Sequence, residues 1–134
     1  MKVIFIDFSE IYYQDIAKTA APEKRTGKFV QIRNNDTEYL VFSPKELTPY
    51  HAGLVERFCA EKGLKGSYDN TNKSFAMHES DWFVVGGGKF EIDNTEKCIR
   101  LYDNSLAYGR FDSKGLKEKI HLISGMSDYE VLIE

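Results

Sequence analysis

Short runs of apolar and β-branched residues recur along most of the chain, separated by residues that favour turns. Runs of this kind, bounded by Gly, Asn, Asp or Pro, are typical of β-strands. We expect strands at residues 3–8, 28–33, 38–42, 82–85, 89–92, 98–102 and 129–133. The turn residues 34–37 predict a hairpin between the second and third strands. The three glycines 86–88 predict a β-bulge where strand 82–85 continues into strand 89–92.

Two segments carry apolar residues at helical spacing. The first begins at Thr48-Pro49, because threonine can cap a helix and proline suits its first position, and it ends at Gly63. The second is capped by Ser113 or Asp112 and ends at Gly125. Five to seven strands in one sheet with two helices predict an α/β fold on the borderline of α+β.

Three other segments have no clear period. Residues 11–21 fit either a short helix or an irregular loop, and Pro22–Gly27 is predicted to be a turn on the solvated surface. Residues 65–81 are rich in Gly, Ser, Asn, Asp and Lys, and we expect a long loop with its own short strand or hairpin. No internal repeat or second domain is apparent, so the 134 residues predict one domain.

The composition excludes several classes of function. A net charge of −3 leaves no basic field for nucleic acid or an anionic membrane. Cys59 and Cys98 have neither metal-ligand spacing nor a disulfide framework, which indicates a reduced, cytoplasmic compartment. The apolar opening Met1–Ile6 meets Asp7 too soon for a signal peptide or membrane span. Without a heptad or a long exposed apolar patch, we expect a monomer.

One histidine lies in the first turn of a predicted helix. The positive end of the helix dipole disfavours a charged imidazole at His51, and the free N–H groups there can hold an anion. A neutral imidazole beside an anion site suits attack on a phosphoryl group. The alternative is a partly buried histidine satisfied by a backbone carbonyl, and spacing alone slightly favours this structural role. We expect His78 and His121 to be surface or packing residues.

Two further segments could approach a ligand through their backbones. Gly86 to Gly88 permit close backbone approach, although a bulge is the likelier explanation of the run taken alone, and they lack the Gly-Lys-Ser/Thr spacing of a nucleotide phosphate loop. Ser105 to Gly109 could present consecutive N–H groups as an anion nest. No His, Cys, Asp or Glu residues share a metal-ligand spacing, so we expect no metal and no cofactor.

Four motifs together resemble the Janus/Ocnus family, whose best-known members are the 14 kDa phosphohistidine phosphatases. The motifs are Tyr50-His51-Ala52, Gly86-Gly87-Gly88-Lys89, Ser105-Leu106-Ala107-Tyr108-Gly109 and Asp128-Tyr129-Glu130-Val131. The resemblance spans about residues 28–133 and implies a single mixed sheet flanked by two main helices. Residues 1–134 then form one Janus/Ocnus-like domain with a loop insertion at residues 65–81. The implied activity is metal-independent hydrolysis of the P–N bond in a phosphohistidine-containing protein.

The resemblance also implies roles for individual residues. His51 matches the catalytic histidine, as nucleophile or as general base. Lys28 matches a substrate-binding lysine, and Lys89 stands where family members often have arginine. The phosphate-contacting loop corresponds to Ser105, Leu106 and Ala107, with the alanine acting through its N–H group. Further candidates are Tyr50, Gly88 and Arg110.

Two departures from the family pattern leave alternatives open. Ser43 stands where some relatives carry a basic residue, and Lys45 or Arg110 could supply that charge. The insertion at residues 65–81 could be a lid, a partner surface or a neutral addition. One alternative is therefore a non-catalytic phosphate- or phosphoprotein-binding domain of the same fold. Another is a phosphoramidase acting on phospholysine, phosphoarginine or a small phosphoramidate.

Overall fold

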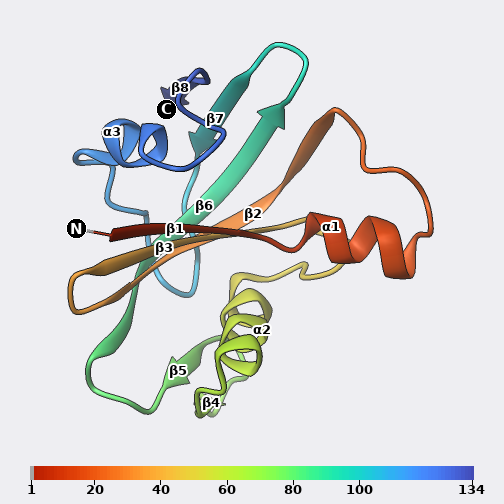
Figure 1. Cartoon of the computed structure of the whole chain (residues 1–134). Coiled ribbons are helices and arrows are strands. Elements are labelled where there is room, and N and C mark those ends of the chain that lie inside the picture. Colours follow the sequence, from red (N-terminus) through yellow and green to blue (C-terminus); the bar gives the residue numbers. More distant parts are fainter. Residues whose placement is uncertain (1) are drawn as a thin grey trace.

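The computed structural model describes residues 2–134, and Met1, the start of the apolar opening, lies outside them. Six strands form a curled mixed sheet in the order β1-β3-β2-β6-β7-β8 (Figure 1). They are β1 (Lys2–Asp7), β2 (Lys24–Asn34), β3 (Thr37–Ser43), β6 (Trp82–Asp93), β7 (Cys98–Tyr102) and β8 (Glu130–Ile133). The two outer pairs, β1 with β3 and β7 with β8, are parallel, and the inner pairs are antiparallel.

The remaining elements are short and lie on both sides of this sheet. They are α1 (Ser9–Ile11), the π-helical turn η1 (Tyr12–Ile16), α2 (His51–Lys62), β4 (Gly66–Tyr68), β5 (Phe75–Met77) and α3 (Leu116–His121). Helix α2 and the small β4–β5 sheet cover one face, and α3 covers the other (Figure 1). The predicted class, a mixed sheet flanked by two main helices, is confirmed, and the modest helices put it on the α+β side. The second, two-stranded sheet is an addition to the predicted single sheet.

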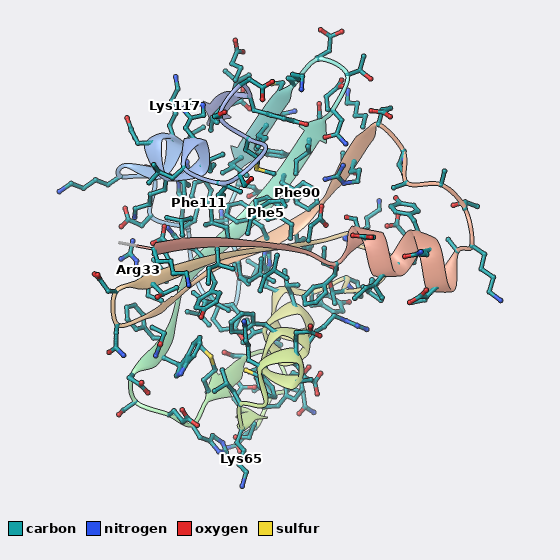
Figure 2. All side chains as sticks on the ribbon, viewed as in Figure 1. Phe5, Arg33, Lys65, Phe90, Phe111 and Lys117 are labelled. Carbon is teal, nitrogen blue, oxygen red and sulfur yellow. The ribbon has the colours of Figure 1, made fainter. Side chains whose placement is uncertain are left out.

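Both faces of the sheet are buried, because successive residues of a strand point to opposite faces. On the α2 side, Val30 packs in one apolar cluster with Leu54 and Phe58. On the α3 side, the neighbouring Phe29 belongs to a second cluster. Figure 2 shows Phe5, Phe90 and Phe111 on this second side. Helix α2 is therefore packed against the sheet through its buried apolar side chains, and its first turn lies over the middle of the sheet.

Two predicted segments of uncertain type are now defined. Residues 65–81 contain the β4–β5 hairpin, as expected, and Phe75 of β5 is buried in the α2-side cluster. Residues 82–93 form one continuous strand, and its pairing with β2 shifts register between Gln31 and Ile32, next to the glycine run. The expected bulge is confirmed. Within residues 11–21, the helical alternative holds as far as Ile16.

The prediction of a turn at Pro22–Gly27 was wrong from residue 24 onward, whereas the predicted solvent exposure is confirmed for Pro22, Glu23, Lys24 and Thr26. Residues 24–27 are the first part of β2 and pair with β6, from Lys24 opposite Asp93 onward. Gly27 is crowded there, since a Cβ would meet the carbonyl oxygen of Ser43, the ring of Phe90 and Cα of Pro44. The charged and polar side chains of residues 24–27 are typical of a turn. These residues nevertheless form a strand because they pair with the long strand β6.

Both predicted helix caps were also wrong. Helix α2 begins at His51, with Tyr50 in an extended conformation as its N-cap. A turn ties Thr48 to the preceding loop, because its N–H donates to the carbonyl of Pro44 at 3.2 Å. Helix α3 begins after Gly115, whose positive φ of 68° ends the turn that Asp112 stabilises by accepting the N–H of Lys114.

Candidate functional site

A groove with a volume of about 1370 Å³ runs along one side of α2. Its lining comes from the start of α2 and the loop before it, from β2 and β6, from the loop after β7, and from the β4–β5 hairpin. We call the part around the start of α2 the His51 end. Its lining residues are Lys28, Tyr50, His51, Ala52, Gly53, Lys89, Asp103, Asn104, Leu106 and Ala107.

His51 is the first residue of α2, and its side chain is only 7% exposed. Its Nε2 lies 2.9 Å from the carbonyl oxygen of Gly88. Burial lowers the pKa of His51. The hydrogen bond to Gly88 opposes this change, whereas the positive charges of Lys28 and Lys89 add to it. In the neutral ring, Nε2 carries the proton for the carbonyl, and Nδ1 keeps a lone pair to which no described residue donates.

Gly87 lets the His51 ring lie directly against the sheet. A Cβ on Gly87 would come within 2.8 Å of Cδ2 of His51 and 2.7 Å of the carbonyl oxygen of Phe29. Gly86 is similarly crowded by the backbone of Arg110 and Phe111, and Gly88 by the carbonyl oxygen of Tyr102 and the ring of Phe111. At Gly87, the missing side chain thus allows the ring of His51, rather than a ligand, to pack closely against the sheet.

Two lysines of like charge lie side by side at the His51 end. Lys28 on β2 and Lys89 on β6 are cross-strand partners, an arrangement that is unfavourable without a counter-charge. Lys28 is half-buried, with its Nζ 5.8 Å from the ring centroid of Tyr50. Burial lowers the pKa of Lys28, and the charge of Lys89 lowers it further. Nζ of Lys89 pairs with Oδ2 of Asp103 at 3.1 Å. An anion between the two ammonium groups would relieve their repulsion.

The loop after β7 is closed by its own hydrogen bonds. The N–H of Ser105 donates to the carbonyl of Gly109 at 3.1 Å, and the N–H of Gly109 returns to the carbonyl of Ser105 at 2.7 Å. The buried hydroxyl of Ser105 accepts the N–H of Tyr108 at 3.1 Å. These bonds leave the N–H groups of Leu106 and Ala107 without an acceptor among residues 2–134, at the wall of the groove.

The first turn of α2 adds a second set of backbone donors. The N–H groups of Ala52 and Gly53 have no acceptor within the described chain, and both residues line the groove. Unpaired N–H groups at a helix start attract anions, because the helix dipole adds to their partial charge. The His51 end therefore combines two sets of backbone donors with two lysines around one neutral imidazole.

Most of the predicted site residues meet in this groove. Lys28, Tyr50, His51, Lys89, Leu106 and Ala107 all line it. Ser105 does not, and its side chain instead shapes the loop that presents the free N–H groups. Gly88 contributes through its carbonyl to His51. Arg110 lies outside the groove lining and donates to the backbone oxygens of Asp103 at 2.9 Å and Glu134 at 2.6 Å.

Neither Lys45 nor Arg110 supplies the positive charge that some relatives carry at the position of Ser43. Ser43 is fully buried opposite Lys28, and its hydroxyl donates to the carbonyl of Pro44 at 3.4 Å. Neither Lys45 nor Arg110 lines the groove. The positive charge of the His51 end comes from Lys28 and Lys89.

Sequence reasoning missed two parts of the groove. The first is Asp103, the partner of Lys89, which follows strand β7 directly. Its position at the end of a predicted strand, just before the predicted anion nest at Ser105 to Gly109, could have indicated a site residue. The hairpin residues Tyr68, Asn72 and Lys73 also line the groove. They reach it because β5 packs against α2, which no spacing in the sequence indicates.

Other chemistries find less support within the described chain. Among residues 2–134, no group of three or more His, Cys, Asp or Glu residues could hold a metal ion. Burial raises the pKa of Cys59 to about 11, which keeps this thiol protonated and unreactive. No helix in the described residues has the length and apolar character needed to cross a bilayer.

Comparison with known proteins gives one assignment. No curated protein matches the chain. The model of the Janus/Ocnus family (Ocnus) matches residues 22–130, which include the His51 helix, the glycine run and the loop after β7. The match begins after β1, α1 and η1, so these three N-terminal elements lie outside the matched region. Since the match covers most of the sequence, the chain belongs to the Janus/Ocnus family.

Proposed function

We propose that this protein is a metal-independent phosphohistidine phosphatase. The observation that carries the proposal is the neutral ring of His51, whose Nδ1 has no donor among the described residues, at a wall shared with two lysines and two sets of free N–H groups. Membership of the Janus/Ocnus family supports the proposal, because phosphohistidine phosphatases are the family's best-known members.

In the binding step, the phosphoryl group of the substrate enters the His51 end. Its oxygens accept hydrogen bonds from the N–H groups of Leu106 and Ala107 and lie near the ammonium groups of Lys28 and Lys89. A doubly charged phosphoryl group competes with the single carboxylate of Asp103 for Lys89, an exposed pair that water already weakens. Donors that are fixed in advance can hold the charge that develops on the oxygens during transfer.

In the chemical step, Nδ1 of His51 acts on the phosphoryl group by one of two routes. It either attacks phosphorus, so that a P–Nδ1 bond forms while the substrate P–N bond breaks and water later takes the phosphoryl group, or it removes a proton from an attacking water. In both routes the substrate ring, protonated on its second nitrogen, leaves as neutral imidazole. The products are histidine and inorganic phosphate.

The test is phosphate release from a phosphohistidine peptide and from phosphoramidate, with EDTA present, by wild type and by His51→Ala. We expect EDTA-resistant release by wild type and a loss of at least about 100-fold in the variant, the usual scale for a positioned acid or base. Circular dichroism and cooperative unfolding establish that the variant is folded. Unchanged release by folded His51→Ala would refute the assignment. Mass spectrometry after an alkaline quench would detect phosphorylated His51 if the route is direct attack.

Other results of the same assay have distinct meanings. Tight phosphopeptide binding by wild type without any release would indicate a phosphoprotein-binding domain instead of an enzyme. Faster release from phospholysine or phosphoramidate than from phosphohistidine would keep the P–N chemistry and change the substrate. Loss of release on adding EDTA would contradict metal independence.

A further inference from the structure

The groove is longer than a phosphorylated side chain requires. Beyond the His51 end it continues along α2 to a second region, the hairpin end, lined by Glu56, Arg57, Ala60, Tyr68, Asn72 and Lys73. Its volume of about 1370 Å³ exceeds the roughly 300–1,000 Å³ of typical small-molecule pockets. From His51 to Ala60 the helix rises about 14 Å, enough for about four residues of extended polypeptide.

The hairpin that forms this end is held firmly to the rest of the site. The hydroxyl of Tyr108 accepts the N–H of Phe75 at 2.9 Å and donates to the Phe75 carbonyl at 2.7 Å. Tyr108 belongs to the loop that presents the free N–H groups, so one side chain joins that loop to the hairpin. The hydroxyl of Tyr68 donates to Glu56 of α2 at 2.8 Å. The hairpin is therefore a fixed wall of the groove rather than a separate lobe.

The charges at the hairpin end favour a negative ligand. The carboxylate of Glu56 is already occupied by the hydroxyl of Tyr68. The guanidinium of Arg57 lies over the ring of Phe8, 5.7 Å from its centroid, and forms no ion pair among the described residues. The ammonium group of Lys73 likewise has no acidic partner within residues 2–134. The hydroxyl partner leaves the charge of Glu56 in place, but two cations against this one carboxylate give the lining of the hairpin end a net positive charge.

We propose that the hairpin end is a subsite for an acidic polypeptide segment next to the phosphorylated residue. Lys73 is its charged contact on the hairpin, and Asn72 offers a side-chain amide to the peptide backbone. The inference rests on the proposed function for the phosphorylated residue, which would occupy the His51 end. It assigns the insertion at residues 65–81 a role in selecting the protein substrate.

Binding of two non-hydrolysable probes tests the subsite. One probe is a phosphohistidine mimic, a phosphorylated triazole side chain, within a short peptide with glutamates on both sides. The other is the same mimic as a free, end-blocked amino acid. Isothermal titration measures both with wild type, Lys73→Glu and the matched control Lys65→Glu. Lys65 precedes the same hairpin but is exposed and does not line the groove (Figure 2).

We expect the peptide to bind wild type more tightly than the free mimic does. Lys73→Glu should weaken peptide binding about threefold to tenfold, the scale of a reversed surface charge, and leave the free mimic unchanged. Lys65→Glu should change neither probe. High salt should narrow the difference between wild type and Lys73→Glu, because the contact is exposed and screened.

Several results would overturn the subsite. They are equal binding of the two probes by wild type, equal effects of the two charge reversals, or an equal loss for peptide and free mimic. Phosphate release by wild type, measured separately, keeps the two proposals apart. If wild type releases phosphate but Lys73→Glu binds the acidic peptide as tightly as wild type does, only the subsite is refuted. If Lys73→Glu weakens peptide binding but wild type releases no phosphate, the subsite is supported and the phosphatase is refuted.

Discussion

The surroundings of His51 and His121 differ, although both imidazoles make the same kind of hydrogen bond. Nε2 of His51 lies 2.9 Å from the carbonyl oxygen of Gly88, and Nε2 of His121 lies 2.7 Å from that of Tyr129. His51 begins α2 on one face of the sheet, and His121 ends α3 on the other. A helix start attracts anions, and a helix end attracts cations.

The comparison teaches that a bonded ring nitrogen does not decide the role of a histidine, because the other nitrogen can remain free. From sequence, a backbone carbonyl partner for His51 was the structural alternative to catalysis, yet the bond to Gly88 is compatible with both roles. In the neutral ring this bond keeps the proton on Nε2 and leaves Nδ1 free, while burial lowers the pKa of His51. The difference lies in what surrounds each ring. His51 lines the groove together with Lys28, Lys89 and the residues with free N–H groups, whereas His121 is not among the residues that line it.

The largest expected effect is the difference between removing the ring of His51 and removing the ring of His121. His51→Ala should lower kcat/KM for phosphohistidine peptide by at least about 100-fold, whereas His121→Ala should stay within about twofold, because it removes no group near the reacting atoms. Steady-state phosphate release measures both. A comparable loss in the two variants would mean that the distinction between the two regions is mistaken.

The next effect concerns the cations around His51. Lys28→Gln should lower kcat/KM about 10- to 100-fold, because a charged donor to the phosphoryl oxygens is lost. Lys117→Gln is the matched control, since Lys117 is exposed on α3, on the other side of the sheet (Figure 2). If the two variants release phosphate equally well, Lys28 has no part in binding the phosphoryl group.

A third prediction targets the packing of the His51 ring. Gly87→Ala should destabilise the fold by about 1–3 kcal/mol, since the new methyl group overlaps both the ring and the backbone of β2. Gly53→Ala, in α2 with no atom within 4 Å of the new Cβ, should be neutral or stabilise by up to about 1 kcal/mol. Urea unfolding gives both values. Equal stability of the two variants would contradict the close contact between Gly87 and His51.

The smallest expected effect is the pH dependence of activity and stability that follows from the pKa of His51. Burial lowers the pKa of His51 in the folded state, so its neutral form, and with it activity, should persist below about pH 6.5, the usual histidine value. The unfolded chain takes up a proton there first, so this histidine's contribution to stability is present above about pH 6.5 and is lost as the pH falls toward the folded value. NMR titration of the ring checks the direction. A folded pKa above the usual value would contradict it.

The sequence was sufficient to locate most of the strands along the chain and to name most of the residues that line the His51 end. Alternating apolar residues located β2 and β3, and the histidine beside Tyr50, the glycine run and the loop at Ser105 each gave a local signal. Lys28 and Lys89 meet because their strands pair; Lys89 follows the glycine motif, and the family resemblance had implied Lys28.

The rest depended on contacts between distant segments. The cap at Thr48 failed because a turn from Pro44 holds it, and its buried hydroxyl has no partner in the described chain. Residues 24–27 resemble a turn in sequence because the strand that pairs with them is distant. Asp93, opposite Lys24, lies almost seventy positions along the chain. The hairpin end of the groove exists only because Phe75 packs against α2 and bonds to Tyr108.

The free N–H groups at the His51 end have a consequence for how this site can change over evolutionary time. A side-chain substitution leaves a backbone N–H in place, and only proline removes it. The side chain of Leu106 is fully exposed, so its identity can drift while its N–H group still faces the groove. What descendants of this chain must inherit at that position is the shape of the loop, which Ser105 and Gly109 set, rather than the residue itself.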